Sequence, residues 1–181
     1  MANALTNIQL IDLAKRLQDT QIADICYKCE LEEQILQYNQ GYIINLEDEN
    51  APGNGTHWVC FIVVKYPNDK RVGYYYDSYG VGPPKEVTRF CRGIEMHYNK
   101  ADHQSLMASV CGFFCLAFLY FVTRCDLRSK DLLKDAKTFC DLYHDLNVSN
   151  DFKHNEFVLE QFFKAEPSGR TLIKDEEPSH L

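Results

Sequence analysis

The 181-residue chain lacks both a long hydrophobic run and an excess of positive charge. Its longest apolar stretch, residues 110–122, is shorter than the roughly 20 residues that a membrane-spanning helix needs. With 19 Lys and Arg against 26 Asp and Glu, the net charge of -7 argues against binding to nucleic-acid phosphates. Glycine and proline are also scarce, at 9 and 6 residues, and 45% of the chain is hydrophobic. We therefore expect a globular domain with no membrane partner and with DNA unlikely as one.

We also expect no secretory leader. The residues after Met1 show no basic segment followed by an apolar block. Eight cysteines are present, and in a secreted protein an even number would suggest disulfide bridges. We therefore expect a reducing compartment, a protein that is not secreted, and free thiols.

Hydrophobic periodicity predicts a small α+β domain over residues 1–164, with a mostly antiparallel central sheet flanked by helices. The polar residues 165–181 are expected to form a disordered tail. Thr6 and Gln9 have the spacing of a helix capping box. Residues 21–37 fit a loop followed by a short helix. We expect helices at about 6–18, 85–91, 110–123 and 129–146, and strands at 41–46, 58–64, 71–76 and 94–98. Residues 151–163 fit either a shorter helix or a strand followed by a helix.

The pair Cys26-x-x-Cys29 lacks the partners that a zinc or redox site needs. No second Cys-x-x-Cys or His-x-x-x-His supplies two further zinc ligands. A thioredoxin-like setting of strand, helix and strand is missing around the pair. We therefore predict no metal site, and we read Cys60, Cys125 and Cys140 as small buried hydrophobic residues.

Cys111 stands apart because it falls at the expected N-terminus of the buried helix. Backbone N–H groups and the positive end of the helix dipole favour a thiolate there, with Ser109 as the expected N-cap. Gly112 has no side chain, which would leave room for a substrate carbonyl beside the sulfur. The alternative reading, a buried cysteine on an apolar helix, suits Cys115 better.

A nucleophilic cysteine needs a base, and His57 is the best placed of the six histidines. It stands where a Gly-rich loop enters a strand, and a hairpin links that strand to one ending at Asp77. Antiparallel pairing would bring His57 beside Asp77, as a base and its orienting carboxylate require. A strand-end Asp is equally typical of a turn. The segment around His97 and His103 is polar and predicts no fixed orientation for either imidazole.

Four groups of residues now stand in one order along the chain: Gly55-Thr56-His57-Trp58, Asp77-Ser78-Tyr79-Gly80, Gln104, and Cys111-Gly112-Phe113-Phe114-Cys115. Together they resemble the adenovirus endopeptidase (adenain) family of cysteine proteases, which is related to the ubiquitin-like-protein-specific proteases. The resemblance covers residues 5–163. The short chain, and Asp77 where adenovirus enzymes commonly have Glu, are more similar to members from virophages and Polinton (Maverick) elements.

The resemblance implies a role for each matching residue of a cysteine protease domain. Cys111 would be the nucleophile, His57 the general base, and Asp77 the residue that orients the imidazole. Gln104 and the backbone N–H of Cys111 would donate to the oxyanion. Trp58 and Gly112 would line the substrate cleft.

The resemblance also implies a substrate and a setting. Family members prefer glycine near the scissile bond, and viral members mature capsid and core precursors in the virion or the infected cell. No cofactor is expected, although adenovirus enzymes are assisted by DNA and by a peptide disulfide-bonded to the enzyme. Cys91 lies in a comparable region, whereas the charge of -7 opposes activation by DNA. We expect a monomer.

Two other functions remain open at this stage. A protease of the same fold could act on precursors or conjugates of ubiquitin-like proteins. A non-enzymatic interaction module could keep the fold, but such a module would not need His57, Asp77, Gln104 and Cys111 together.

Overall fold

The computed structural model describes residues 5–17, 20–47, 57–106, 108–124 and 131–164. Its sheet has five strands in sequential order: β1 (Ile22–Tyr27), β2 (Gly41–Asn45), β3 (Trp58–Lys65), β4 (Arg71–Tyr76) and β5 (Glu95–Tyr98). The helices are α1 (Asn7–Arg16), the 3-10 helix η1 (Lys28–Glu33), α2 (Lys85–Phe90), α3 (Cys111–Thr123), α4 (Leu132–Cys140) and α5 (Phe152–Lys164).

The sheet is mixed, so the expectation of a mostly antiparallel sheet is wrong. β2 pairs antiparallel with β3, and β3 with β4, whereas the outer pairs β1–β2 and β4–β5 are parallel. Each parallel pair is joined through a helix, η1 or α2, as a parallel connection requires. β1 itself was expected to be a loop, because it is an edge strand with mostly half-buried side chains and no clear alternation.

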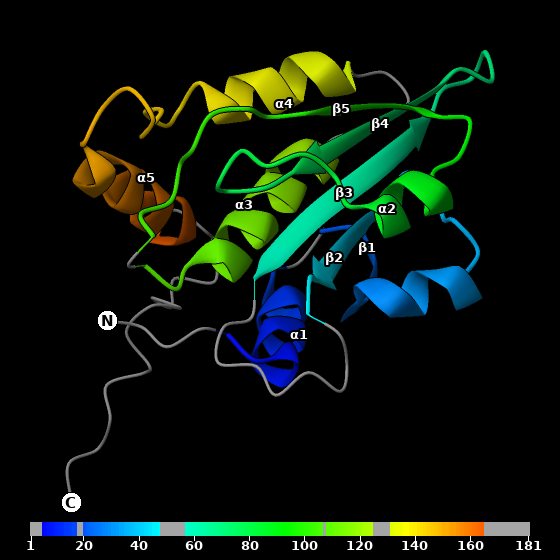
Figure 1. The fold of residues 1–181 in the computed structure, drawn as a ribbon, viewed down its shortest axis with the longest axis horizontal. Coiled ribbons are helices and arrows are strands. Elements are labelled where there is room, and N and C mark those ends of the chain that lie inside the picture. Colours follow the sequence, from blue (N-terminus) through cyan, green and yellow to red (C-terminus); the bar gives the residue numbers. More distant parts are fainter. Residues whose placement is uncertain (1–4, 18–19, 48–56, 107, 125–130, 165–181) are drawn as a thin grey trace, which may run out of the picture.

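The sheet lies between two layers of helices (Figure 1). Side chains alternate along β3, so Trp58, Cys60, Ile62 and Val64 face a large core that α1, α3, α4 and α5 share. The side chains between them face a smaller core with η1 and α2. This arrangement confirms the expected α+β class with flanking helices.

Helix α3 is the centre of the larger core, as its apolar sequence predicts. Every residue of α3 except Phe121 is buried. A Cβ atom at Gly41 in β2 would lie 2.5 Å from the Leu119 side chain, so this glycine lets α3 approach the sheet closely. The close packing fixes the position of the N-terminus of α3 relative to β3.

The remaining helices lie close to their predicted positions, but their lengths agree less well with the prediction. The capping box forms at α1, where Thr6 and Gln9 exchange hydrogen bonds. Helix α4 ends at Cys140, so the expectation of a helix reaching 146 is wrong. The predicted tail, 165–181, lies outside the described residues. Within the described part of the chain, none of the helices combines the length and apolarity needed to cross a bilayer.

Candidate active site

The hairpin β3–β4 brings His57 and Asp77 together, as predicted. In the ladder Cys60 pairs with Tyr76, so His57 just precedes β3 where Asp77 follows the end of β4. The Nε2–H of His57 donates to Oδ1 of Asp77 at 2.8 Å. The carboxylate is 2% exposed and the imidazole 23% exposed, so only the imidazole reaches solvent.

Asp77 is held in place by its neighbours. Its Oδ1 also accepts a hydrogen bond from the backbone N–H of Tyr79 at 2.8 Å. The buried side chain of Asn99, just after β5, accepts from the backbone N–H of Asp77 at 3.0 Å and donates to its carbonyl at 2.6 Å. Sequence reasoning missed Asn99, since nothing local indicates that β5 runs beside β4.

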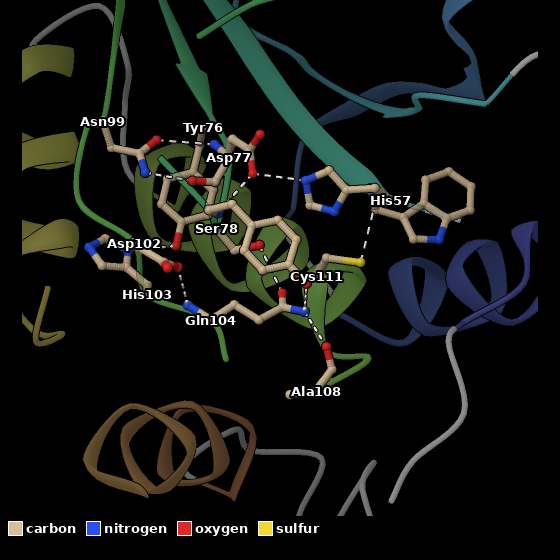
Figure 2. A network of polar contacts seen from close by, with 12 residues as sticks. His57, Tyr76, Asp77, Ser78, Asn99, Asp102, His103, Gln104, Ala108 and Cys111 are labelled. Atoms are coloured by element: carbon tan, nitrogen blue, oxygen red, sulfur yellow. Dashed lines mark hydrogen bonds and ion pairs between the residues drawn. The ribbon is translucent and has the colours of Figure 1, made fainter. Parts of the chain in front are cut away.

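Cys111 is the first residue of α3, and its sulfur lies beside the imidazole of His57. Figure 2 shows His57 between the Asp77 carboxylate and the Cys111 sulfur. The backbone N–H of Trp58 donates to Sγ at 3.5 Å. Cys111 is 4% exposed. The expected N-cap is wrong: Val110 occupies the cap position, and no side chain caps the helix.

The surroundings of His57 favour its protonated form. Burial disfavours the charged imidazolium, but the hydrogen bonds with Asp77 and Cys111 outweigh burial and raise the pKa of His57 to about 9. An imidazolium beside Sγ stabilises a thiolate, the reactive form of cysteine. Cys115, one turn along α3, is 1% exposed, and burial raises the pKa of its thiol well above the usual range.

Gln104 lies near Cys111, and both polar atoms of its side chain make hydrogen bonds. Its Oε1 accepts a hydrogen bond from the Ser78 hydroxyl at 2.8 Å. Its Nε2 donates to the carbonyl of Ala108 and, at 3.1 Å, to the hydroxyl of Tyr79 (Figure 2 shows the Ala108 contact). The ring of Tyr79 also contacts the ring of His57, with centroids 4.8 Å apart. Tyr79 therefore touches both sides of the site, although sequence reasoning gave it no role.

The backbone before Gln104 is fixed by residues from distant parts of the chain. The backbone N–H groups of His103 and Gln104 both donate to the carbonyl of Ser78, at 2.7 and 3.1 Å. Asn155 of α5 is 1% exposed and donates to the carbonyl of His103 at 3.0 Å. The same amide joins α5 to the backbone of His144, through contacts of 2.7 Å.

His103 is fixed, contrary to the expectation of an unconstrained polar segment. It is 1% exposed, and its Nδ1 is hydrogen-bonded to the Tyr76 hydroxyl at 3.0 Å. Its ring stacks on that of Tyr143, with centroids 5.3 Å apart. Burial lowers the pKa of His103 to about 4, so the buried imidazole is neutral at pH 7.

Among the described residues Trp58 and Gly112 pack into the core, and their role in binding substrate stays a prediction. Trp58 has no exposed surface, and its indole N–H donates to the carbonyl of Leu5 at 2.9 Å. A Cβ atom at Gly112 would lie 3.1 Å from Leu5, 3.3 Å from Leu10 and 3.5 Å from Trp58. The missing side chain of Gly112 therefore makes room for the core. The N-terminal segment that covers Trp58 is far from it in sequence, so no local pattern indicated this burial.

The other cysteines that the structure describes differ in how deeply they are buried. Cys60 is fully buried, and Cys140 is half-buried. Cys91 is 2% exposed, and burial raises the pKa of its thiol to about 12. Cys125 lies outside the described residues. Within the described ranges, no three potential ligands from His, Cys, Asp and Glu gather as a metal site would require.

The fold is similar to that of solved proteases. The ASFV pS273R protease in its Se-Met form aligns with 87% of this chain and 67% of its own, at a TM-score of 0.54 and 16% identity. A second structure of the ASFV pS273R protease gives 87%, 66%, 0.52 and 14%. The Xanthomonas campestris effector protein XopD bound to ubiquitin is more distant, with a TM-score of 0.41 and 14% identity over 78% of this chain and 92% of that one.

These likenesses show a shared fold, and the chain spans about two thirds of the length of the pS273R proteases. No protein-family model matches the chain, and no curated protein is significantly similar to it.

Proposed function

We propose that the protein is a cysteine endopeptidase with Cys111 as its nucleophile. The observation that carries the proposal is the row Asp77–His57–Cys111, with 2.8 Å between the carboxylate and the imidazole, and with the imidazole between that carboxylate and the thiol sulfur (Figure 2). A nucleophile, a base and a group that orients the base are the parts that acyl transfer needs. The fold shared with the pS273R protease supports the same reading.

The geometry gives each group a step in peptide hydrolysis. His57 holds the thiol proton while Sγ of Cys111 bonds to the substrate carbonyl carbon, and the carbonyl π pair moves onto oxygen. The negative oxygen forms on the side of the site that holds Gln104 and the N-terminus of α3. Its pair returns as the C–N bond breaks, and His57 protonates the leaving amine. Water then attacks the thioester, loses a proton to His57, and releases the acid and the thiol.

The enclosed thiol supports glycine near the scissile bond. Cys111 is 4% exposed, and the ring of Tyr79 lies against that of His57. A residue without a side chain approaches such a sulfur at the least steric cost. With the family resemblance, this supports maturation of viral capsid and core precursors as the biological role, in the virion or the infected cell.

Activation by a disulfide-bonded peptide remains part of the proposal only under one condition. Cys91 is buried in the smaller core, and its raised pKa disfavours the thiolate that disulfide exchange requires. Exchange at Cys91 would therefore require α2 to open first.

A peptide library tests the specificity directly. Peptides containing Gly-Gly, Gly-Ala or Ala-Ala should be incubated with the enzyme and with Cys111→Ala, and the products identified by mass spectrometry. We expect cleavage at glycine, a loss of about 10-fold or more in kcat/KM when alanine replaces it, and no cleavage by Cys111→Ala.

Two results would contradict the specificity. Equal cleavage of glycine and alanine peptides would remove the preference for glycine. Cleavage of a ubiquitin-like fusion, with none of capsid-derived peptides, would assign the enzyme to ubiquitin-like proteins instead.

A further inference from the structure

We propose that Tyr79 is a catalytic residue whose hydroxyl donates a hydrogen bond to the oxyanion formed at Cys111. The inference rests on the proposed cysteine-protease function and names a donor that the sequence did not indicate. It follows from the hydrogen bonds of Gln104 and from the contacts that hold Tyr79 in the site.

Both protons of the Gln104 amide are already donated in hydrogen bonds within the protein. The carbonyl of Ala108 can only accept a hydrogen bond, so the atom of Gln104 beside it is Nε2. The second proton of Nε2 points to the hydroxyl oxygen of Tyr79, at 3.1 Å. The Ser78 hydroxyl donates to Oε1 at 2.8 Å and so fixes the amide in this orientation. In this arrangement Gln104 could donate to the substrate only by giving up one of these two partners.

The hydroxyl of Tyr79 is the next donor in the same chain. Its oxygen accepts from Gln104, which leaves its own proton to donate elsewhere. Among the residues that the structure describes, no hydrogen bond is made by that proton. A hydroxyl that accepts a hydrogen bond is polarised and becomes a stronger donor. The chain of hydrogen bonds Ser78–Gln104–Tyr79 therefore leaves the Tyr79 hydroxyl as the group with a proton to donate.

Two further contacts hold Tyr79 against the base His57 and its carboxylate partner. Its backbone N–H is bonded to the carboxylate of Asp77 at 2.8 Å, and its ring lies against the imidazole of His57, with centroids 4.8 Å apart. Burial and then the negative charge of Cys111 raise the pKa of Tyr79, so the phenol keeps its proton at neutral pH. Throughout the reaction Tyr79 donates a hydrogen bond and transfers no proton.

Two reactions of the same thiol separate this role from any effect on the thiolate. In alkylation by iodoacetamide, Sγ bonds to the methylene carbon and iodide leaves, so no oxyanion forms. In acylation by p-nitrophenyl acetate, Sγ bonds to the carbonyl carbon, the oxygen becomes negative, and its pair returns as p-nitrophenolate leaves. A donor to the oxyanion accelerates only the second reaction.

The test compares Tyr79→Phe with the wild type in both reactions, after subtracting the rates of Cys111→Ala. We expect alkylation of Cys111 at an unchanged rate and acylation slowed by about 10- to 100-fold. Tyr98→Phe is the matched control, because Tyr98 is 40% exposed and loses a hydroxyl in the same way. It should leave both rates unchanged.

Each other outcome overturns the inference in a recognisable way. If Tyr79→Phe is acylated as fast as the wild type, or faster, the hydroxyl is not an oxyanion donor. If alkylation slows as much as acylation, Tyr79 acts on the thiolate. If neither reagent reacts with Cys111 in the wild-type protein, the proposed function is wrong, and so is the role of Tyr79 that depends on it.

Discussion

Acid should destabilise the protein through His103, the buried histidine next to Gln104. The pKa of His103 is lowered to about 4 in the folded protein, against 6.5 for an ordinary histidine. Burial is the main cause, and the nearby negative charge of Asp145 offsets it only in part. Above the unfolded pKa both states are neutral, and His103 then contributes no pH dependence. Between the two values only the unfolded chain takes up the proton, so stability falls as the pH falls.

The size of the effect follows from the two pKa values. Each pKa unit corresponds to about 1.4 kcal/mol, so the full difference is on the order of 3 kcal/mol, reached below about pH 4. At about pH 5 the loss relative to pH 7.5 is about 2 kcal/mol. Because the backbone N–H groups of His103 and Gln104 share the carbonyl of Ser78, a proton on this imidazole should also loosen Gln104.

Urea unfolding of the wild type and of His103→Gln, at both pH values, measures the effect. Glutamine stays neutral over this range and keeps a polar partner for the Tyr76 hydroxyl. We expect the stability of His103→Gln to change with pH by about 2 kcal/mol less than that of the wild type, whatever its stability at pH 7.5. An equal pH dependence in the two proteins, or an NMR titration of His103 near 6.5, would refute the reasoning.

The remaining predictions concern the groups that hold the base. Asp77→Asn should lower the pKa of His57 and reduce kcat by about 100-fold or more, and a pH–rate profile unchanged from the wild type would remove Asp77 from the site. Asn99→Ala should cost about 1–3 kcal/mol in unfolding free energy and lower kcat more than it changes KM; unchanged kinetics would show that Asp77 holds its position without this amide. Gly80→Ala, at φ +70, puts a Cβ atom 2.6 Å from a backbone carbonyl, so thermal unfolding should show a larger loss than in Gly93→Ala, which has φ +81 and open space. Equal losses of thermal stability in the two variants would show that the backbone near Gly80 shifts to relieve the close contact.

Local patterns in the sequence predicted the parts of the site that depend on neighbouring residues. A hairpin was enough to place His57 beside Asp77, because its turn fixes which strand ends meet. The apolar run after Cys111 was enough to place that residue at a helix N-terminus. Both predictions are confirmed as positions in the fold, and their catalytic roles stay proposals.

Contacts between distant segments could not be predicted from local patterns in the sequence. The parallel pairing of β1 and β5 depends on crossovers whose return position no local pattern specifies. Asn155 lies 52 residues from His103, and Trp58 is covered by a segment 53 residues away. The glycine at 112 also makes room for Leu5 and Leu10 of the N-terminal segment, which no local pattern indicated.

The central claim is that Cys111 is the nucleophile, and labelling it by a thiol-directed electrophile is the most direct measurement. The wild type, Cys111→Ala and Cys115→Ser should be treated with limiting iodoacetamide at neutral pH, digested and mapped by mass spectrometry, with peptide cleavage assayed in parallel. We expect the label on Cys111 first, loss of both that label and cleavage in Cys111→Ala, and retention of both in Cys115→Ser. A label that falls first on Cys115, or cleavage that survives in Cys111→Ala, would contradict the proposed mechanism.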